Sequence, residues 1–150
     1  MVIGFSVTYG NDRFVAVSYN SPHTMTSADG INWITKFDAA SSIAYGNGIF
    51  VAVSNSGNYG AAYSSDGLTW TVSVYAPADA WESVVYGNGY FMATSYNGPT
   101  MYSQDGIHWS TDVSGAKVFD WKSITYGNNE FFTIDGHGGS IMTTQLTNTF

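Results

Sequence analysis

The chain has 150 residues, of which 44% are hydrophobic and 17% aromatic, so it can bury a sizeable core within one domain. Its 11 acidic and 4 basic residues give a formal net charge of −7, whereas a surface that binds phosphates needs clustered lysine and arginine. This balance argues against nucleic acid and anionic membranes as partners, and the lack of cysteine excludes disulfides and thiolate metal sites.

The beginning of the sequence and its apolar runs argue against targeting or insertion. Residues 1–9 contain neither a basic region nor a long apolar stretch, so no secretory signal is expected there. No run approaches the roughly 20 apolar residues of a membrane-spanning helix.

A repeated unit organises the chain. The triplet Tyr-Gly-Asn recurs at intervals of about 40 residues, and an apolar run that starts with phenylalanine follows each copy. The triplets begin at Tyr9, Tyr45, Tyr86 and Tyr126. Three units continue with Ser-x-Asp-Gly-x-x-Trp, at residues 27–33, 64–70 and 103–109. Because glycine supplies the positive φ of tight hairpin turns, each unit predicts four short strands, a to d, joined as a meander.

The strand that starts with phenylalanine indicates how the units pack. It is apolar at consecutive positions, which is typical of a strand covered on both faces. Its third position is small in every copy, as close packing of neighbouring sheets requires. In a β-propeller, neighbouring blades cover each blade on both faces. The sequence therefore predicts an all-β fold, a β-propeller of four-stranded antiparallel blades in one domain, 1–150, with repeats at approximately 5–40, 41–80, 81–121 and 122–150.

The fourth unit differs from the others. Residues 141–150 align with residues 100–109, but Leu146 and Thr147 replace Asp-Gly, and Phe150 stands where the tryptophan is expected. We expect the outer strand of this blade to be absent or short, with its edge covered by residues 1–4 or by another chain. Four blades that close alone and a ring completed by a second chain both stay open.

The Ser-x-Asp-Gly-x-x-Trp motif resembles the Asp-box, or BNR repeat, of sialidase-like propellers, whose usual pattern is Ser-x-Asp-x-Gly-x-Thr-Trp. Here glycine directly follows aspartate and the box is one residue shorter. Together with Tyr-Gly-Asn-Gly-x-Phe, the pattern is similar to the divergent repeats of phage tail and bacterial surface proteins. In that family the boxes lie on turns away from the active site.

The box residues themselves suggest a structural role. The aspartates can accept backbone N–H bonds, the glycines supply special dihedral angles, and we expect the tryptophans to be buried between blades. These residues are Asp29, Gly30, Trp33, Asp66, Gly67, Trp70, Asp105, Gly106 and Trp109.

Residue counts argue against catalysis. The resemblance to sialidases implies three arginines around a substrate carboxylate, but Arg13 is the only arginine of the chain. A glycosidase needs two carboxylates about 5–10 Å apart, and no recognisable pair occurs in the sequence. We therefore expect no enzymatic activity, no catalytic residue, no cofactor and no zinc site, while a weak calcium site with oxygen ligands stays open.

Loops at one end of the predicted blades carry the candidate ligand site. In a meander blade the b–c and d–a connections share one end, and here they differ between repeats, as binding loops on a repeated scaffold commonly do. They are rich in aromatic rings and amides, which suit sugars and also protein contacts. The candidate residues are Tyr19, Asn20, His23, Asn58, Tyr59, Trp81, Tyr96, Asn97, Trp121, Asp135 and His137.

The leading expectation is a non-catalytic module that binds carbohydrate or a cell-surface receptor, as a component of a phage virion or tail or of a bacterial surface. Its place would be the virion or the extracellular surface. Two alternatives stay open: a structural virion decoration or assembly protein without glycan binding, and a glycoside hydrolase. Other virion proteins and a second copy that completes the propeller are further expected partners.

Overall fold

The computed structural model describes residues 4–18, 24–38, 40–96, 98–112, 120–136, 139 and 141–144. These residues form strands and turns, and they include no helix that is long and apolar enough to cross a membrane.

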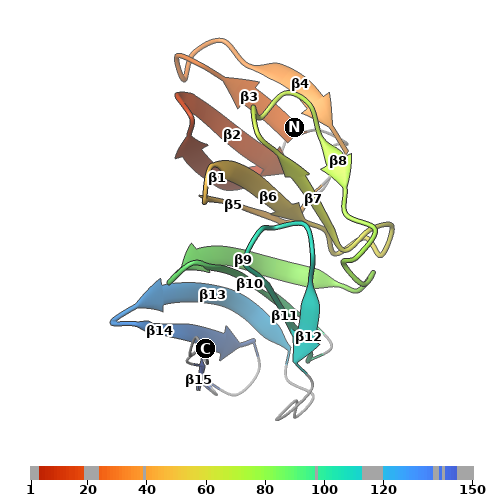
Figure 1. Cartoon of the computed structure of the whole chain (residues 1–150), viewed down its shortest axis with the longest axis vertical. Helices are drawn as coiled ribbons and strands as arrows, with labels where there is room; N and C mark the ends of the chain where they lie inside the picture. Colours follow the sequence, from red (N-terminus) through yellow and green to blue (C-terminus); the bar gives the residue numbers. More distant parts are fainter. Residues whose placement is uncertain are drawn as a thin grey trace.

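Four antiparallel sheets follow one another along the chain (Figure 1). The first contains β1 (Gly4–Gly10), β2 (Arg13–Ser18), β3 (Thr24–Ser27) and β4 (Ile34–Phe37). The second contains β5 (Ser42–Gly46), β6 (Ile49–Val53), β7 (Ala61–Ser64) and β8 (Thr71–Val72). The third contains β9 (Trp81–Gly87), β10 (Tyr90–Ser95), β11 (Thr100–Ser103) and β12 (Ser110–Asp112). The fourth contains β13 (Trp121–Gly127), β14 (Glu130–Asp135) and β15 (Ile141–Thr144). In each sheet the spatial order of the strands follows the chain, which confirms the meander.

The turns between strands a and b explain why Tyr-Gly-Asn recurs. In the second sheet Gly46 pairs with Ile49, and the two residues between them, Asn47 and Gly48, have φ of 48° and 80°. Two positive φ values define a turn whose twist matches that of the flanking strands. Asparagine tolerates the first position and glycine favours the second, so the dipeptide sets the hairpin and its register.

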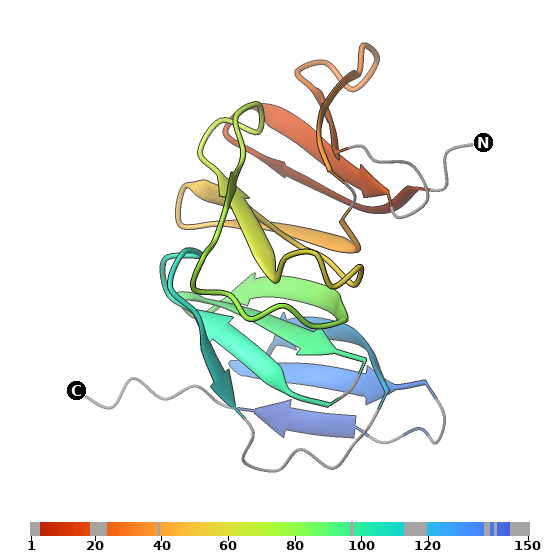
Figure 2. The ribbon, with the colours of Figure 1, turned by 90° about the vertical axis from the view of Figure 1, so that its right-hand side faces the viewer.

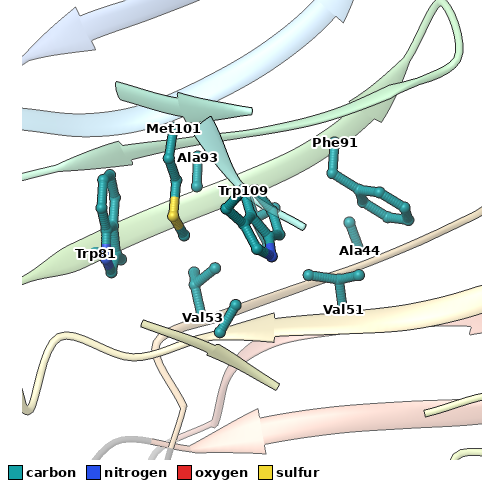
Figure 3. Close-up of a cluster of buried hydrophobic side chains, with 10 residues drawn as sticks. Ala44, Val51, Val53, Trp81, Phe91, Ala93, Met101 and Trp109 are labelled. Atoms are coloured by element: carbon teal, nitrogen blue, oxygen red, sulfur yellow. The ribbon is translucent and has the colours of Figure 1, made fainter. Parts of the chain in front are cut away.

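The sheets stack as propeller blades, which we number 1 to 4 in chain order. Strand a of each blade contacts strand a of the next, β1 with β5, β5 with β9 and β9 with β13 (Figures 1 and 2). Apolar side chains fill the space between consecutive blades. Between blades 2 and 3, Val51 and Val53 face Phe91, Trp81 and Trp109 (Figure 3).

The apolar runs of the inner blades are covered on both faces, as the sequence predicts. Phe50 and Phe91 are fully buried, and so are the small residues two positions later, Ala52 and Ala93. Burial of these runs on both faces distinguishes an inner blade from a sheet that has one solvent-exposed face.

Blades 1 and 4 lie at opposite ends of the stack (Figures 1 and 2). Gly4 pairs with Ser18 in blade 1, while residues 1–3 lie outside the described part. In the described part, blade 4 has three strands, and residues 145–150, where an outer strand would follow, lie outside it.

Candidate functional site

The three Asp-box-like motifs form tight turns held by the aspartate. Asp66 accepts hydrogen bonds from the backbone N–H groups of Leu68 and Thr69 at 2.8 and 2.7 Å, and the hydroxyl of Ser64 donates to it at 3.0 Å. Asp29 and Asp105 accept the corresponding bonds in their own turns.

These bonds stabilise the charged form of the box carboxylates. The N–H groups of Thr69 and Leu68 lower the pKa of Asp66 to about 2. The pKa of Asp29 is also held well below its usual value, chiefly by the N–H of Asn32. For Asp105, desolvation raises the pKa, but the hydrogen bonds from the side chain and backbone of His108 outweigh it. The carboxylates therefore act within the turns, which agrees with the expected structural role.

The three box tryptophans have different surroundings. Trp109 is buried against blade 2 with 8% of its surface exposed, and Trp70 is partly buried against blade 1. The expectation that Trp33 is buried between blades is wrong, because 37% of its surface is exposed and none of the described blades covers it. Its indole N–H still donates to the carbonyl of Gly30, at 3.1 Å.

Three of the candidate ligand residues are core residues, which corrects the expectation. Trp81 and Trp121 are only 0% and 2% exposed, and the indole N–H of Trp81 donates to the carbonyl of Pro77 at 2.8 Å. Tyr59 is buried beside Phe37, and burial raises its pKa to about 12. None of these rings is available to a ligand, because Trp81 and Trp121 begin β9 and β13 with their side chains buried, and Tyr59 is buried as well.

The other candidate ligand residues remain at the surface or lie outside the described part. Tyr96 and Asn58 are exposed, and Asp135 is half-buried and accepts a hydrogen bond from the N–H of Gly139 at 3.0 Å. Tyr19, Asn20, His23, Asn97 and His137 lie outside the described residues.

A polar cleft of about 550 Å³ lies at the inner edges of the blades. Its described lining residues come from the starts of the inner strands and from one b–c loop. They are Ser6, Ser41, Ser42, Asn55, Glu82, Ser83, Lys122 and Ser123. The cleft therefore opens at the end of the blades where the b–c and d–a connections lie. This is the end at which the sequence places the candidate ligand residues.

β-Bulges direct the charged residues into this cleft. Trp81 pairs with Ser95 and Ser83 pairs with Thr94, so Glu82 is an extra residue without a partner in the ladder. Lys122 is the extra residue at the same repeat position of β13. A bulge re-aims the side chain that it inserts, which lets a buried tryptophan be followed by a charged residue that faces the cleft.

The charged groups of the cleft are linked to one of the predicted ligand residues. The Lys122 ammonium lies 2.8 Å from Asp120 Oδ1 and 4.4 Å from the centroid of the Tyr96 ring. The hydrogen bond to Asp120 raises the pKa of Lys122, so the ammonium is charged at neutral pH. Also in the cleft, the Asn55 amide donates to Glu82 Oε1 at 3.5 Å. The exposed Tyr96 ring thus contacts a residue that lines the cleft.

None of the described lining residues is among the ligand residues predicted from the sequence, although a signal was present. Ser41, Glu82 and Lys122 all stand four residues before the tyrosine of Tyr-Gly-Asn, and the residue after each is a serine. Variable chemistry at a fixed position of a repeat is typical of a binding surface.

The arrangement suits hydrogen bonding more than acid–base or metal chemistry. Glu82 is the only carboxylate among the described residues that line the cleft. No group of three histidine, aspartate or glutamate side chains that could hold a metal occurs in the described ranges. What the cleft offers is a set of hydroxyl and amide groups, one cation and one anion, beside an exposed aromatic ring.

Comparisons with known proteins identify the fold and no family. No family model and no curated protein matches the chain. Among solved structures, BamB from Moraxella catarrhalis matches with a TM-score of 0.75 and 10% identity, over 97% of this chain and 45% of its own. A virginiamycin B lyase from Staphylococcus aureus matches with a TM-score of 0.73 and 12% identity, over 95% of this chain and 55% of its own. The computationally designed Ika4 protein has a TM-score of 0.73 and 9% identity, over 98% of this chain and 93% of its own.

These similarities confirm the β-propeller fold. At such low identity they say nothing about activity. The chain spans about half the length of BamB and of the lyase, and nearly the whole of Ika4.

Proposed function

We propose that this chain is a non-catalytic binding module that recognises carbohydrate on a cell-surface receptor. The observation that carries the proposal is the cleft at the inner edges of the blades, where bulges direct Glu82 and Lys122 toward a row of serines beside the exposed Tyr96 ring.

The chemistry of the cleft fits a sugar. Hydroxyl groups of a sugar both donate and accept hydrogen bonds, and serine hydroxyls, an amide, a carboxylate and an ammonium provide complementary partners. An exposed tyrosine ring offers a flat apolar surface for the C–H face of a pyranose. The volume of about 550 Å³ falls in the range of small-molecule sites. Because the chain carries a net charge of −7, neutral glycans suit it better than polyanionic ones.

Binding without catalysis is favoured by the carboxylate inventory. Glycoside hydrolysis requires two carboxyl groups on either side of the scissile bond. Within the described part of the cleft Glu82 has no second carboxylate opposite it, and the nearby Asp120 is paired with Lys122.

A glycan array followed by calorimetric titration of the best glycan tests the proposal. Tyr96→Ala and Lys122→Ala each remove one group of the site and should weaken binding at least about tenfold. Tyr75→Ala is the matched control, because Tyr75 is also an exposed tyrosine but packs against His108, and neither residue lines the cleft. The proposal is contradicted if both cleft variants bind the glycan with the affinity of the wild type, or if the array gives no signal. Hydrolysis of a glycoside that is lost in Glu82→Gln would instead favour the hydrolase.

We also propose that the module is displayed on a virion or a bacterial surface. This part is supported by the resemblance of its repeats to those of phage tail and bacterial surface proteins. An antibody against the chain should label intact particles or cells in electron micrographs, and labelling confined to the cell interior would contradict display. A role in assembly is favoured by a separate observation, the uncovered faces of the two end blades.

A further inference from the structure

Consecutive blades meet through one repeated contact, a tyrosine ring on a glycine. A Cβ atom added to the glycine of Tyr-Gly-Asn would overlap the tyrosine ring of the next blade. The pairs are Gly10 with Tyr45, Gly46 with Tyr86, and Gly87 with Tyr126. The remaining glycine and the remaining tyrosine have no such partner among the described residues: no described atom lies within 4 Å of a Cβ added to Gly127, and Tyr9 is 55% exposed.

A second repeated contact joins the inner strands. The serine that stands three residues before the tyrosine accepts a hydrogen bond from a backbone N–H of the next blade. The pairs are Ile43 to Ser6 at 3.3 Å, Val84 to Ser42 at 3.1 Å, and Ile124 to Ser83 at 3.3 Å. These three apolar residues are 4–7% exposed, whereas Val7, which holds the same position in blade 1, is 62% exposed. Ser123 is the fourth serine.

A third contact joins the turns at the opposite end of the blades. The side-chain amide of Asn11 donates to the carbonyl of Ser65 at 3.0 Å, and that of Asn47 donates to the carbonyl of Gln104 at 3.4 Å. Each bond runs from the a–b turn of one blade to the c–d turn of the next. If blade 1 followed blade 4 in the same way, Asn128 would donate to the carbonyl of Ala28. Both residues are exposed.

The apolar faces of the end blades are uncovered in the same complementary way. On blade 1, Trp33 is exposed where Trp109 of blade 3 is buried against its neighbour. On blade 4, Ile134 is exposed, whereas Val17 and Val53 at the same position of blades 1 and 2 are fully buried.

We propose that blade 1 of one copy packs on blade 4 of a second copy, so that two chains close one eight-bladed ring. Tyr9 of each copy lies on the second copy's Gly127, the N–H of Val7 donates to the second copy's Ser123, and Asn128 donates to the second copy's Ala28. The two new interfaces then repeat the contacts that already join blades within the chain. This assembly is independent of glycan binding.

The geometry of the two end blades favours a second copy of this chain over another protein as the partner that covers their exposed faces. One end of the stack carries the tyrosine and the other its glycine, so the two ends are complementary to each other and not each to itself. A two-fold rotation joins both pairs of ends at once and leaves no uncovered face, which makes the assembly closed. Because the four blades match about half of BamB and of the lyase, propeller rings of that size have room for about four more blades.

Light scattering and sedimentation at several concentrations test the ring. One copy has a mass of 16.2 kDa, and we expect the wild type to have twice that mass. Gly127→Leu fills the space meant for Tyr9, and Val7→Glu places a charge in the interface, so both variants should be monomers with an unchanged far-ultraviolet circular dichroism spectrum. Val74→Glu is the matched control, because Val74 is also an exposed valine but lies outside both interfaces, and this variant should remain a dimer. A monomeric wild type, a larger assembly, or a Gly127→Leu variant that is still dimeric would overturn the proposal.

A crosslink tests the register without loss of the interface, and it serves if Gly127→Leu does not fold. The chain has no cysteine, so the double variant Val7→Cys with Ser123→Cys introduces the only thiols. These positions lie at opposite ends of one copy but face each other in the ring. Mild oxidation should give a covalent dimer on a non-reducing gel, and the pair Val74→Cys with Ser123→Cys should not. The proposed register between copies is contradicted if both cysteine pairs crosslink equally, or if the pair Val7→Cys with Ser123→Cys does not crosslink.

Discussion

Substitution of Gly46 by alanine tests how closely consecutive blades pack. Gly46 lies at the end of β5 and pairs with Ile49, in extended backbone that alanine also adopts, so only its surroundings decide the outcome. The new methyl group would overlap the ring of Tyr86, which itself packs on Phe91 with ring centroids 4.7 Å apart. The ring must therefore leave its place.

The cost follows from overpacking and from lost burial. Forcing an extra methyl group into a packed site costs about 1–3 kcal/mol. Uncovering part of the ring adds roughly 1 kcal/mol. We expect Gly46→Ala to reduce the free energy of unfolding by about 2–4 kcal/mol, a large fraction of the total for a domain of this size.

Gly127→Ala is the matched control, because it changes the same position of the same triplet, where the added methyl group meets no atom of the described residues within 4 Å. Alanine is favoured over glycine within a strand by roughly 0.5–1 kcal/mol, so this variant should be as stable as its parent or more so. Both substitutions are made in the Val7→Glu chain, so that association of copies does not contribute. Urea unfolding should separate the two midpoints by about 1–2 M. Free energies of unfolding within about 0.5 kcal/mol of each other would refute the idea that tyrosine fills the glycine site.

Three further expectations concern the boxes and the core. Asp66 has a folded-state pKa of about 2, below that of the unfolded chain, so it stabilises the fold above pH 4 and loses this effect as the pH falls towards 2. The urea midpoint of the wild type should exceed that of Asp66→Asn at pH 7, and the difference should shrink by pH 2.5; a constant difference contradicts the linkage. Trp81→Ala should lower the free energy of unfolding by about 3–5 kcal/mol, because it leaves a large cavity in the core, and a loss below 1 kcal/mol by the same assay would contradict its burial. Ser42→Ala leaves the buried N–H of Val84 without its acceptor and should cost about 1–3 kcal/mol in thermal or urea unfolding, and an unchanged stability would contradict that bond.

The sequence by itself determined the hairpin turns and the box turns of this protein, because both depend on residues that are close together in the chain. Asn-Gly after Tyr-Gly, as in the second and third units, defines a two-residue hairpin. The spacing of serine, aspartate and glycine in each box lets one carboxylate accept N–H groups two and three residues ahead, as it does at Asp66. Recurrence of the unit then predicted similar blades, and the apolar runs predicted burial on both faces, which the structure shows for the inner blades.

Only the tertiary structure decided which copies of a motif are buried and which side chains face the axis. Trp33 and Trp109 belong to the same motif, and one is exposed while the other is buried, because burial depends on whether a preceding blade is present. Trp81 looked like a ligand residue and is a core residue, while Glu82 beside it faces the cleft. That difference arises from a bulge, a single extra residue in the register between two strands. Register depends on the partner strand, so it cannot be seen in one strand's own sequence.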